Sequence, residues 1–420
     1  MKTSKVQSIL QKYLMPIANK VEQQKHLQAI KEGMIGIIPI IILGSFCLLP
    51  IAVKNLLGSG AIADFIGRHM KGLTYANQFT TGLIAIYAVF FIANALAKRY
   101  DFKSNFVGIT AMVVFLILSG IPIKDGLGTA YLGAEGLFTS IVAAILTVEV
   151  TRFMVNKKLV IKLPDSVPEM VGESFSILFP FIVNVIIATS VSMLVQYTTG
   201  SVFPQWFMKI LAPAVGSMDT LPAILIVVFL TQLLWFFGLH GPGITSAVWV
   251  PFAVSYGAAN VASYAAGQPV SHFFTFGFYY ALIQVTGSGL TLGLVILMMR
   301  SKSKNFSAIG KASIIPSIFG INEPVIFGAP IILNPFLFIP FVFGPLIIAT
   351  ICYLTMSLGI VGMPIAEPPS FLPPGVGAFL MTLDWKAVVL VFACLALMTL
   401  IYYPFFKAME AEELKKEIEA

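Results

Sequence analysis

Long apolar stretches separated by short polar connections dominate the sequence. The clearest stretches are roughly 18 residues or longer, which is about the length of α-helix that crosses a hydrocarbon core. The pattern therefore predicts membrane-spanning helices at 33–53, 79–97, 104–121, 132–150, 175–197, 219–239, 272–299, 336–361 and 386–406.

Two stretches have an amphipathic pattern instead. Residues 6–21 place apolar residues at helical spacing beside lysines and glutamines, which predicts a helix lying along the membrane interface. Residues 201–218 align Trp206, Phe207 and Ile210 on one face, which predicts an interfacial arm that joins two membrane halves.

The second half interrupts its apolar runs with prolines, glycines and single polar residues. These interruptions gather in "FFGLHGPGITSAVWVP", which contains His240, and in the stretch from Ser313 to Pro345. An interior proline removes a backbone hydrogen bond, and a freed carbonyl finds no water in hydrocarbon. Irregular backbone at membrane depth is tolerated where it is buried in protein or lines a cavity, so the pattern predicts re-entrant hairpins around a substrate site.

Composition supports a membrane protein, because 58% of the 420 residues are hydrophobic and only 11% are charged. The net charge of +7 does not indicate nucleic-acid binding, since most of the 26 Lys and Arg residues fall at the N-terminus, at the C-terminus and in alternate loops. This distribution predicts cytoplasmic termini and about ten spans. Ten spans with both termini in the cytoplasm require that 242–265 and 312–378 each cross the membrane once in net. At least one of these two segments is then expected to be irregular. The N-terminal lead is too long and too charged for a cleavable signal peptide.

Glu323 is the clearest candidate for a functional residue. It lies in "FGINEPVIFGAP", residues 319–330, where a carboxylate at the bilayer centre would cost at least about 2.5–3.5 kcal/mol unless it were partnered or faced water. One interpretation is that Asn322 and Glu323 hydrogen-bond to the hydroxyls of a polar ligand. The other is that Glu323 ties one limb of a hairpin to the other. His240, judged from residue chemistry alone, either caps a helix end or contacts a ligand.

Several kinds of chemistry have no support in the sequence. The three cysteines, Cys47, Cys352 and Cys394, lie in apolar runs without CxxC spacing, so we expect neither a disulfide framework nor a metal site. No GxGxxG, Walker, HExxH or GxSxG pattern indicates a soluble enzyme, and no cofactor is expected.

Two motifs make the interpretation specific. "FGINEPVIFGAPIILNP", residues 319–335, resembles the signature of the membrane-embedded IIC components of the bacterial phosphoenolpyruvate-dependent sugar phosphotransferase system. "WFFGLHG", residues 235–241, is similar to the companion motif of the lactose, cellobiose and diacetylchitobiose branch of that family. The resemblance extends over nearly the whole chain.

The resemblance implies a homodimer in the bacterial plasma membrane that binds a β-linked disaccharide and works with IIA and IIB components. A IIB cysteine on another chain would donate the phosphate. Glu323 would bind the sugar hydroxyl that becomes phosphorylated and is the candidate for its base, with His240 and Asn322 beside it. Relatives commonly carry tryptophan at the position that matches Phe371, in "EPPSFLPPGVGAF", where an aromatic ring would stack on the sugar.

The expected fold is therefore an all-α polytopic membrane protein with about ten transmembrane helices, re-entrant hairpins and two membrane subdomains. The expected division is a cytoplasmic amphipathic helix at 1–29, a five-helix scaffold and dimerisation domain at 30–200, the interfacial arm at 201–218, a sugar-binding transport domain at 219–406 that moves as an elevator, and a cytoplasmic tail at 407–420.

Two other classes remain open at this point. An ion-coupled secondary sugar transporter would share broken helices and a carboxylate at membrane depth, but it would need no IIB partner. An intramembrane enzyme would need a catalytic pair or metal cluster at membrane depth, and the sequence does not offer one.

Overall fold

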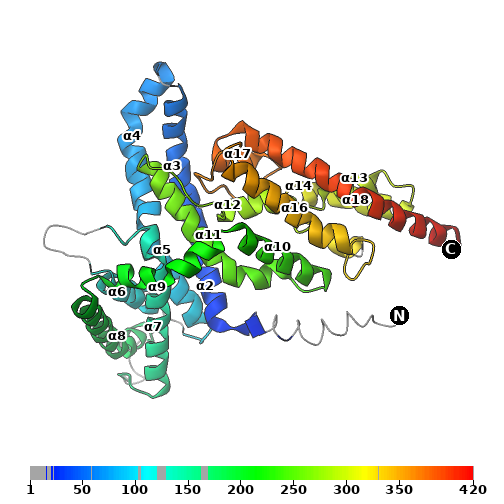
Figure 1. The fold of residues 1–420 in the computed structure, drawn as a ribbon. Helices are drawn as coiled ribbons and strands as arrows, with labels where there is room; N and C mark the ends of the chain where they lie inside the picture. Colours follow the sequence, from blue (N-terminus) through cyan, green and yellow to red (C-terminus); the bar gives the residue numbers. More distant parts are fainter. Residues whose placement is uncertain are drawn as a thin grey trace. The chain divides into compact units, whose positions relative to one another are not determined.

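A computed structural model describes residues 16, 20–21, 23–57, 59–102, 106–120, 129–161, 169–329 and 331–419 (Figure 1). These residues form helices and connections, with no β-strand in the described part of the chain. The predicted all-α membrane fold is confirmed. Most of the predicted N-terminal amphipathic helix at 6–21 lies outside the described residues.

Six described segments are long and apolar enough to cross a membrane, and a bent helix pair can supply a seventh. The bent pair joins Phe203–Met218 to Leu221–Phe236 at an angle of 68°. The number is roughly consistent with the predicted ten, because Phe106–Leu118 is apolar but short and the 25-residue helix Gly241–Ala265 carries polar residues and a proline. The six segments are Lys25–Pro50, Ala61–Lys98, Ala134–Asn156, Phe175–Thr199, Phe338–Ser357 and Trp385–Ile418.

The chain divides into two compact units by its internal contacts. One contains the residues up to Val215 together with Val250–Ala266, and the other contains Gly216–Trp249 and Gly267–Ala420. The helix Gly241–Ala265 contributes to both units. The functional roles predicted for the ranges 30–200 and 219–406 remain predictions.

Small residues allow the helices of the first unit to pack closely, as is usual where helices associate in membranes. A Cβ atom at Gly33 of α2 would lie 2.3 Å from Ile92 of α5, and one at Gly108 of α6 would lie 2.6 Å from Asn94 of α5. Helix α5 therefore packs directly against its neighbours. The helices are α2 (Lys25–Gly36), α3 (Ile38–Leu57), α4 (Ala61–Phe79), α5 (Ile84–Lys98), α6 (Phe106–Leu118), α7 (Leu137–Asn156), α8 (Glu169–Thr199) and α9 (Phe203–Met218), with the C-terminal part of α11 (Gly241–Ala265).

Helix α4 was not among the predicted elements. Its sequence carries Asp64, Arg68, His69 and Lys71, so its mean hydropathy is too low for the apolar pattern that identified the other helices. Only one side of it is buried, including Ala63 and Ile66. The predicted arm at 201–218 is helical, as α9, and its placement at the membrane interface remains a prediction.

The second unit also depends on close helix approaches. A Cβ atom at Gly310 of α14 would lie 2.6 Å from the backbone of Met299, and one at Gly293 of α13 would lie 2.4 Å from Thr399 of α18. Helices α13, α14, α16 and α18 accordingly pack together (Figure 1). The helices are α10 (Leu221–Phe236), the N-terminal part of α11, α12 (Phe276–Phe278), the π-helix η3 (Tyr279–Ile283), α13 (Leu292–Met299), α14 (Lys304–Ile318), α15 (Glu323–Gly328), α16 (Phe338–Ser357), α17 (Val376–Thr382) and α18 (Trp385–Glu419).

The irregular segments differ in part from the expectation. Of the two segments in question, 242–265 is one continuous helix, whereas 312–378 is broken into α15, α16, α17 and the end of α14. The predicted span at 272–299 was wrong as a single helix. It begins as extended chain and continues as α12 and η3, and residues 284–291 form turns before α13 begins.

The last helix continues far beyond a membrane span and anchors the connection between α13 and α14. The buried carboxylate of Glu410 accepts the backbone N–H of Lys302 at 2.9 Å and the hydroxyl of Ser301 at 2.5 Å. Glu417 accepts the hydroxyl of Ser303 at 2.6 Å, and Ser303 in turn caps the first turn of α14. The tail at 407–419 is therefore part of α18 and packs on the second unit.

Candidate functional site

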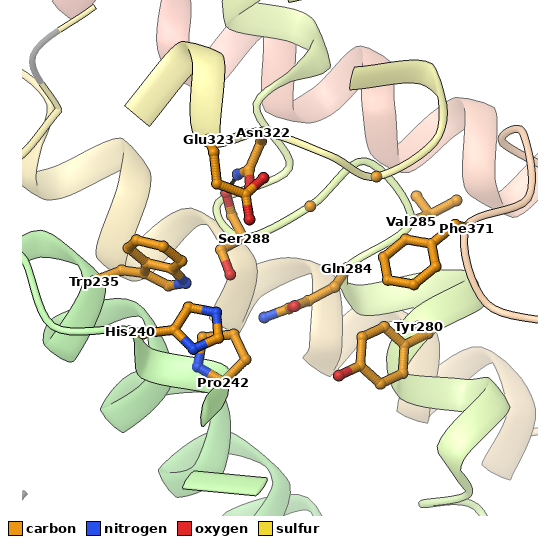
Figure 2. Close-up of a pocket in the computed structure, with 12 residues that line it drawn as sticks. Trp235, His240, Pro242, Tyr280, Gln284, Val285, Ser288, Asn322, Glu323 and Phe371 are labelled. Carbon is orange, nitrogen blue, oxygen red and sulfur yellow. Dashed lines mark hydrogen bonds between the residues drawn. The ribbon is translucent and has the colours of Figure 1, made fainter. Parts of the chain in front are cut away.

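A cavity of about 190 Å³ lies where the broken segments of the second unit meet. Polar and aromatic side chains share its wall, together with two glycines (Figure 2). The lining residues are Trp235, His240, Pro242, Tyr280, Gln284, Val285, Gly287, Ser288, Gly320, Asn322, Glu323 and Phe371.

Glu323 and Asn322 reach the cavity from the first turn of α15. Asn322 is only 4% exposed, and its side-chain Nδ2 donates a hydrogen bond to the backbone carbonyl of Ser288, while its own carbonyl accepts the N–H of Val325 at 3.0 Å. Glu323 occupies the first position of α15, where its carboxylate is exposed to the cavity and no described residue pairs with it. A carboxylate held in this way is available to a ligand.

Gly287 allows Asn322 to take this position. Its φ is +84°, and a Cβ atom there would lie 2.5 Å from Cγ of Asn322 and 2.8 Å from the carbonyl oxygen of Gly320. Real Cβ contacts are longer than this, so only glycine lets the loop at 284–291 approach the connection before α15. The close approach brings Ser288 beside Glu323 (Figure 2).

Trp235 and His240 form a second part of the wall. Trp235 lies in the last turn of α10, and its ring contacts the ring of His240 edge to face, with the centroids 5.0 Å apart. The backbone carbonyl of His240 accepts the N–H of Ile244 at 3.3 Å, so this residue begins α11 while its ring lines the cavity. Trp235 lines the cavity, and its buried Nε1 atom has no acceptor among the described residues.

Tyr280 and Phe371 form the opposite wall, with their ring centroids 6.5 Å apart. We call these two residues the aromatic wall. Gln284 lies between the aromatic wall and His240 in Figure 2, and its Nε2 donates to the hydroxyl of Tyr279 at 2.8 Å. Phe371 is 59% exposed and has a φ of +63°, a left-handed conformation that is uncommon for a side chain of this size.

The structure brings all four sequence-predicted site residues, Glu323, Asn322, His240 and Phe371, to one cavity. Their roles in binding and catalysis remain predictions. The sequence interpretation did not identify Trp235, Tyr280, Gln284 and Ser288 as lining residues. For three of them the signal was present in "YYALIQVTGSGL", residues 279–290, where polar residues and glycines interrupt an apolar run as they do around Glu323.

A second cavity of about 510 Å³ lies in the first unit and is lined by residues of 78–83, 129–135 and 259–263. None of the predicted site residues lies there. Its one charged lining residue is Glu135, which is exposed.

The chemistry of the smaller cavity suits a neutral ligand rich in hydroxyl groups. Carboxylate and amide oxygens accept hydrogen bonds, while amide, indole and hydroxyl groups donate them. Aromatic faces pack against the apolar C–H faces of a ring. A few directed polar groups in a largely apolar wall are typical of small-molecule sites. No group of three or more His, Cys, Asp or Glu residues suited to a metal occurs in the described part of the chain.

Comparison with known proteins places this chain in a family. The model of the family "Phosphotransferase system, EIIC" matches residues 31–345. The chain is 32% identical to the lichenan permease IIC component of Bacillus subtilis, covering 99% of this chain and 96% of that protein. It is 29% identical to the lactose-specific EIICB component of Lacticaseibacillus casei, covering 96% of this chain and 71% of that protein.

A solved structure agrees with these relatives. The crystal structure of the transporter ChbC, the IIC component of the N,N'-diacetylchitobiose-specific phosphotransferase system, superposes with a TM-score of 0.87 at 31% identity, covering 97% of this chain and 99% of that one. The fold is therefore shared. The chain belongs to the EIIC components of the phosphotransferase system, in the branch of lactose, cellobiose and diacetylchitobiose permeases.

Proposed function

We propose that this sugar permease binds a β-linked disaccharide of the cellobiose or diacetylchitobiose type in the cavity around Glu323 and presents it for phosphorylation. The observation that carries the proposal is the exposed carboxylate of Glu323, which no described residue pairs with, in a cavity that also has aromatic walls. A carboxylate that serves only as a structural tie would instead accept hydrogen bonds from the protein.

The arrangement suggests how the disaccharide lies. One sugar ring would place its reacting hydroxyl at Glu323, with Asn322 and His240 as neighbouring polar groups. The second ring would lie toward the aromatic wall, which Figure 2 shows across the cavity from Glu323. Phe371 gives a smaller stacking surface than the tryptophan that relatives commonly carry, so we expect the identity of the sugar to depend on this end.

The proposed reaction is an in-line transfer from a phosphocysteine. The sugar hydroxyl oxygen attacks phosphorus, the S–P bond breaks as the O–P bond forms, and the sulfur leaves as thiolate. Glu323 accepts the proton of the attacking hydroxyl. Such transfers depend chiefly on positioning and on stabilisation of charge, so the acceptor side needs little more than one oriented base.

The donor cysteine lies on a partner in this proposal. The three cysteines of this chain lie in apolar helices, two of them buried, and none lines the cavity. The relative from Lacticaseibacillus casei is named an EIICB component and is longer than this chain, which is consistent with a IIB unit that works beside a IIC unit. The proposal accordingly includes IIB and IIA partners, a homodimer, cytoplasmic termini, and an elevator-like motion of the sugar-binding unit that opens the cavity inward.

The test is equilibrium binding of radiolabelled cellobiose and diacetylchitobiose to the purified protein. We expect saturable binding of at least one of them. Glu323→Ala should weaken that binding at least tenfold, since it removes the acceptor. Glu323→Gln keeps one acceptor oxygen and should bind more tightly than the alanine variant, while phosphorylation by phosphorylated IIB falls about 100-fold or more because the base is lost.

A matched control is Glu412→Gln, at an exposed glutamate of α18 that is paired with Lys416 outside the cavity. Its binding and phosphorylation should equal those of the wild type. Unchanged binding in Glu323→Ala would show that the cavity is not the sugar site. Uptake driven by an ion gradient without IIB would instead favour a secondary transporter.

A further inference from the structure

Glu367 is a buried carboxylate of the second unit, and it does not line the cavity. It lies in the connection between α16 and α17 and is only 3% exposed. Its Oε2 atom accepts a hydrogen bond from the backbone N–H of Gly277, with the two atoms 2.7 Å apart. A buried carboxylate is costly to retain without such a bond, so the contact calls for an explanation.

The two segments that this bond joins are in direct contact. A Cβ atom at Gly277 would lie 2.8 Å from Cδ of Pro368 and 2.9 Å from Oε2 of Glu367. Any side chain at position 277 would therefore push the connection away. The absence of a side chain allows the carboxylate to reach the backbone, and the same bond would be lost if either segment shifted.

Each of the two segments carries one member of the aromatic wall. Tyr280 follows Gly277 by three residues, in η3, and Phe371 follows Glu367 by four residues. Their rings face the same cavity. The hydrogen bond between Gly277 and Glu367 therefore joins the two segments that carry these rings.

Phe371 needs such support. Its left-handed backbone conformation is costly for a bulky residue and persists only where the surroundings hold it. The two residues before Glu367 are already attached to α17, because the N–H groups of Ile365 and Ala366 donate to the carbonyl of Met381 at 2.9 and 3.1 Å. Glu367 is the next residue along the chain, and its carboxylate extends the attachment from α17 to the segment that carries Tyr280.

We propose that Glu367 is a positioning residue of the sugar site, which fastens residues 366–372 to residues 276–284 through Gly277 and so holds the aromatic wall at the width of the second sugar ring. This inference rests on the proposed function. In this proposal Glu367 does not contact the sugar. Loss of its carboxylate should therefore affect the end of the cavity that holds the second sugar ring, and not the end that carries Glu323.

The first experiment measures the Kd of the disaccharide and, by competition, that of the corresponding monosaccharide. Glu367→Ala should weaken disaccharide binding at least tenfold while monosaccharide binding changes less than threefold. Glu367→Gln keeps an acceptor oxygen for Gly277 and should stay within about threefold of the wild type for both sugars. Glu367→Asp keeps the charge but withdraws the acceptor oxygen from Gly277, so its sugar binding should resemble that of the alanine variant. Glu367→Asp is also the milder change, and it replaces Glu367→Ala in the test if that variant does not fold.

Glu410→Ala is the matched control, because Glu410 is also a buried carboxylate of the second unit that accepts a backbone N–H, but it holds residues 301–302 instead of the cavity wall. It should leave both Kd values within about twofold. Equal weakening by Glu410→Ala, or equal loss of monosaccharide and disaccharide binding in Glu367→Ala, would overturn the inference in favour of a general structural role.

A second experiment does not depend on any sugar. A nitroxide is attached to Phe371→Cys in a variant without the three native cysteines, and a control nitroxide is attached at the exposed Phe327 of α15. Glu367→Ala should make the label at 371 more mobile and leave the label at 327 unchanged, and Glu367→Gln should restore the wild-type spectrum. An unchanged spectrum at 371 would refute the fastening. Absence of sugar binding in the wild type, with the mobility change present, would refute the proposed function alone.

Discussion

Gly287 offers a sharp test of how the loop at 284–291 shapes the site. Gly287→Ala adds one methyl group, which would lie 2.5 Å from Cγ of Asn322 and 2.8 Å from the carbonyl oxygen of Gly320. The side chain of Asn322 is already held by its bond to the carbonyl of Ser288. We expect the methyl group to displace Asn322 from the cavity wall, because the backbone on both sides of the contact has little room to move.

The magnitude has two parts. A φ of +84° costs a non-glycine residue about 1–2 kcal/mol. Overpacking against Asn322 adds about 1–3 kcal/mol. If the overpacking free energy is lost entirely from sugar binding, the affinity falls about five- to 150-fold, since each 1.4 kcal/mol is about a factor of ten.

Gly267→Ala separates the two parts. Gly267 has a φ of +69° in the same unit, but a Cβ atom there would meet nothing within 4 Å. Both variants carry the backbone cost, and only Gly287→Ala carries the contact. Calorimetric or radioligand Kd values, measured beside the melting temperature of each variant, give the comparison. If Gly287→Ala binds sugar as tightly as Gly267→Ala, then Asn322 either yields without loss or does not contribute to the site.

Three further outcomes are expected. Gly33→Ala should destabilise the protein by about 1–3 kcal/mol, because its Cβ atom would overlap Ile92, whereas Gly72→Ala in open space should be neutral or stabilise by about 0.5–1 kcal/mol, as measured by thermal unfolding. Glu410→Ala should cost about 1–3 kcal/mol in the same assay, since it leaves Lys302 N–H without its acceptor. Phe371→Trp should tighten disaccharide binding severalfold by enlarging the stacking surface. Weaker binding would show that the cavity has no room for a larger ring at this position.

The sequence predicted the membrane class and the region of the site for identifiable physical reasons. Apolar runs that match the thickness of the bilayer can be read directly from composition, and a charged residue inside such a run is conspicuous because its burial is costly. Glu323 and Asn322 were found in this way. The glycines and prolines around them marked broken backbone, and α15 and its neighbours are broken there.

The missed elements have equally physical reasons. Helix α4 is mostly exposed and carries charges, so its apolar residues never form an uninterrupted run. The segment 272–299 is apolar enough to look like a span, although Gly287 and Gly289 interrupt its apolar run and have positive φ in the turns between 284 and 291. Periodicity reports which residues avoid water, but it does not report where a buried chain changes direction.

The sequence by itself determined that this chain crosses a membrane by helices, that it belongs with the sugar phosphotransferase permeases, and that Glu323 and His240 stand at breaks in apolar runs. Only the tertiary structure decided which side chains share a wall. Tyr280 and Phe371 are 91 positions apart, yet their rings lie together in the wall of one cavity, and the segments that carry them are joined by the hydrogen bond from Gly277 to Glu367. Contacts of this kind depend on the separation of packed segments in space, and spacing along the chain does not encode that separation.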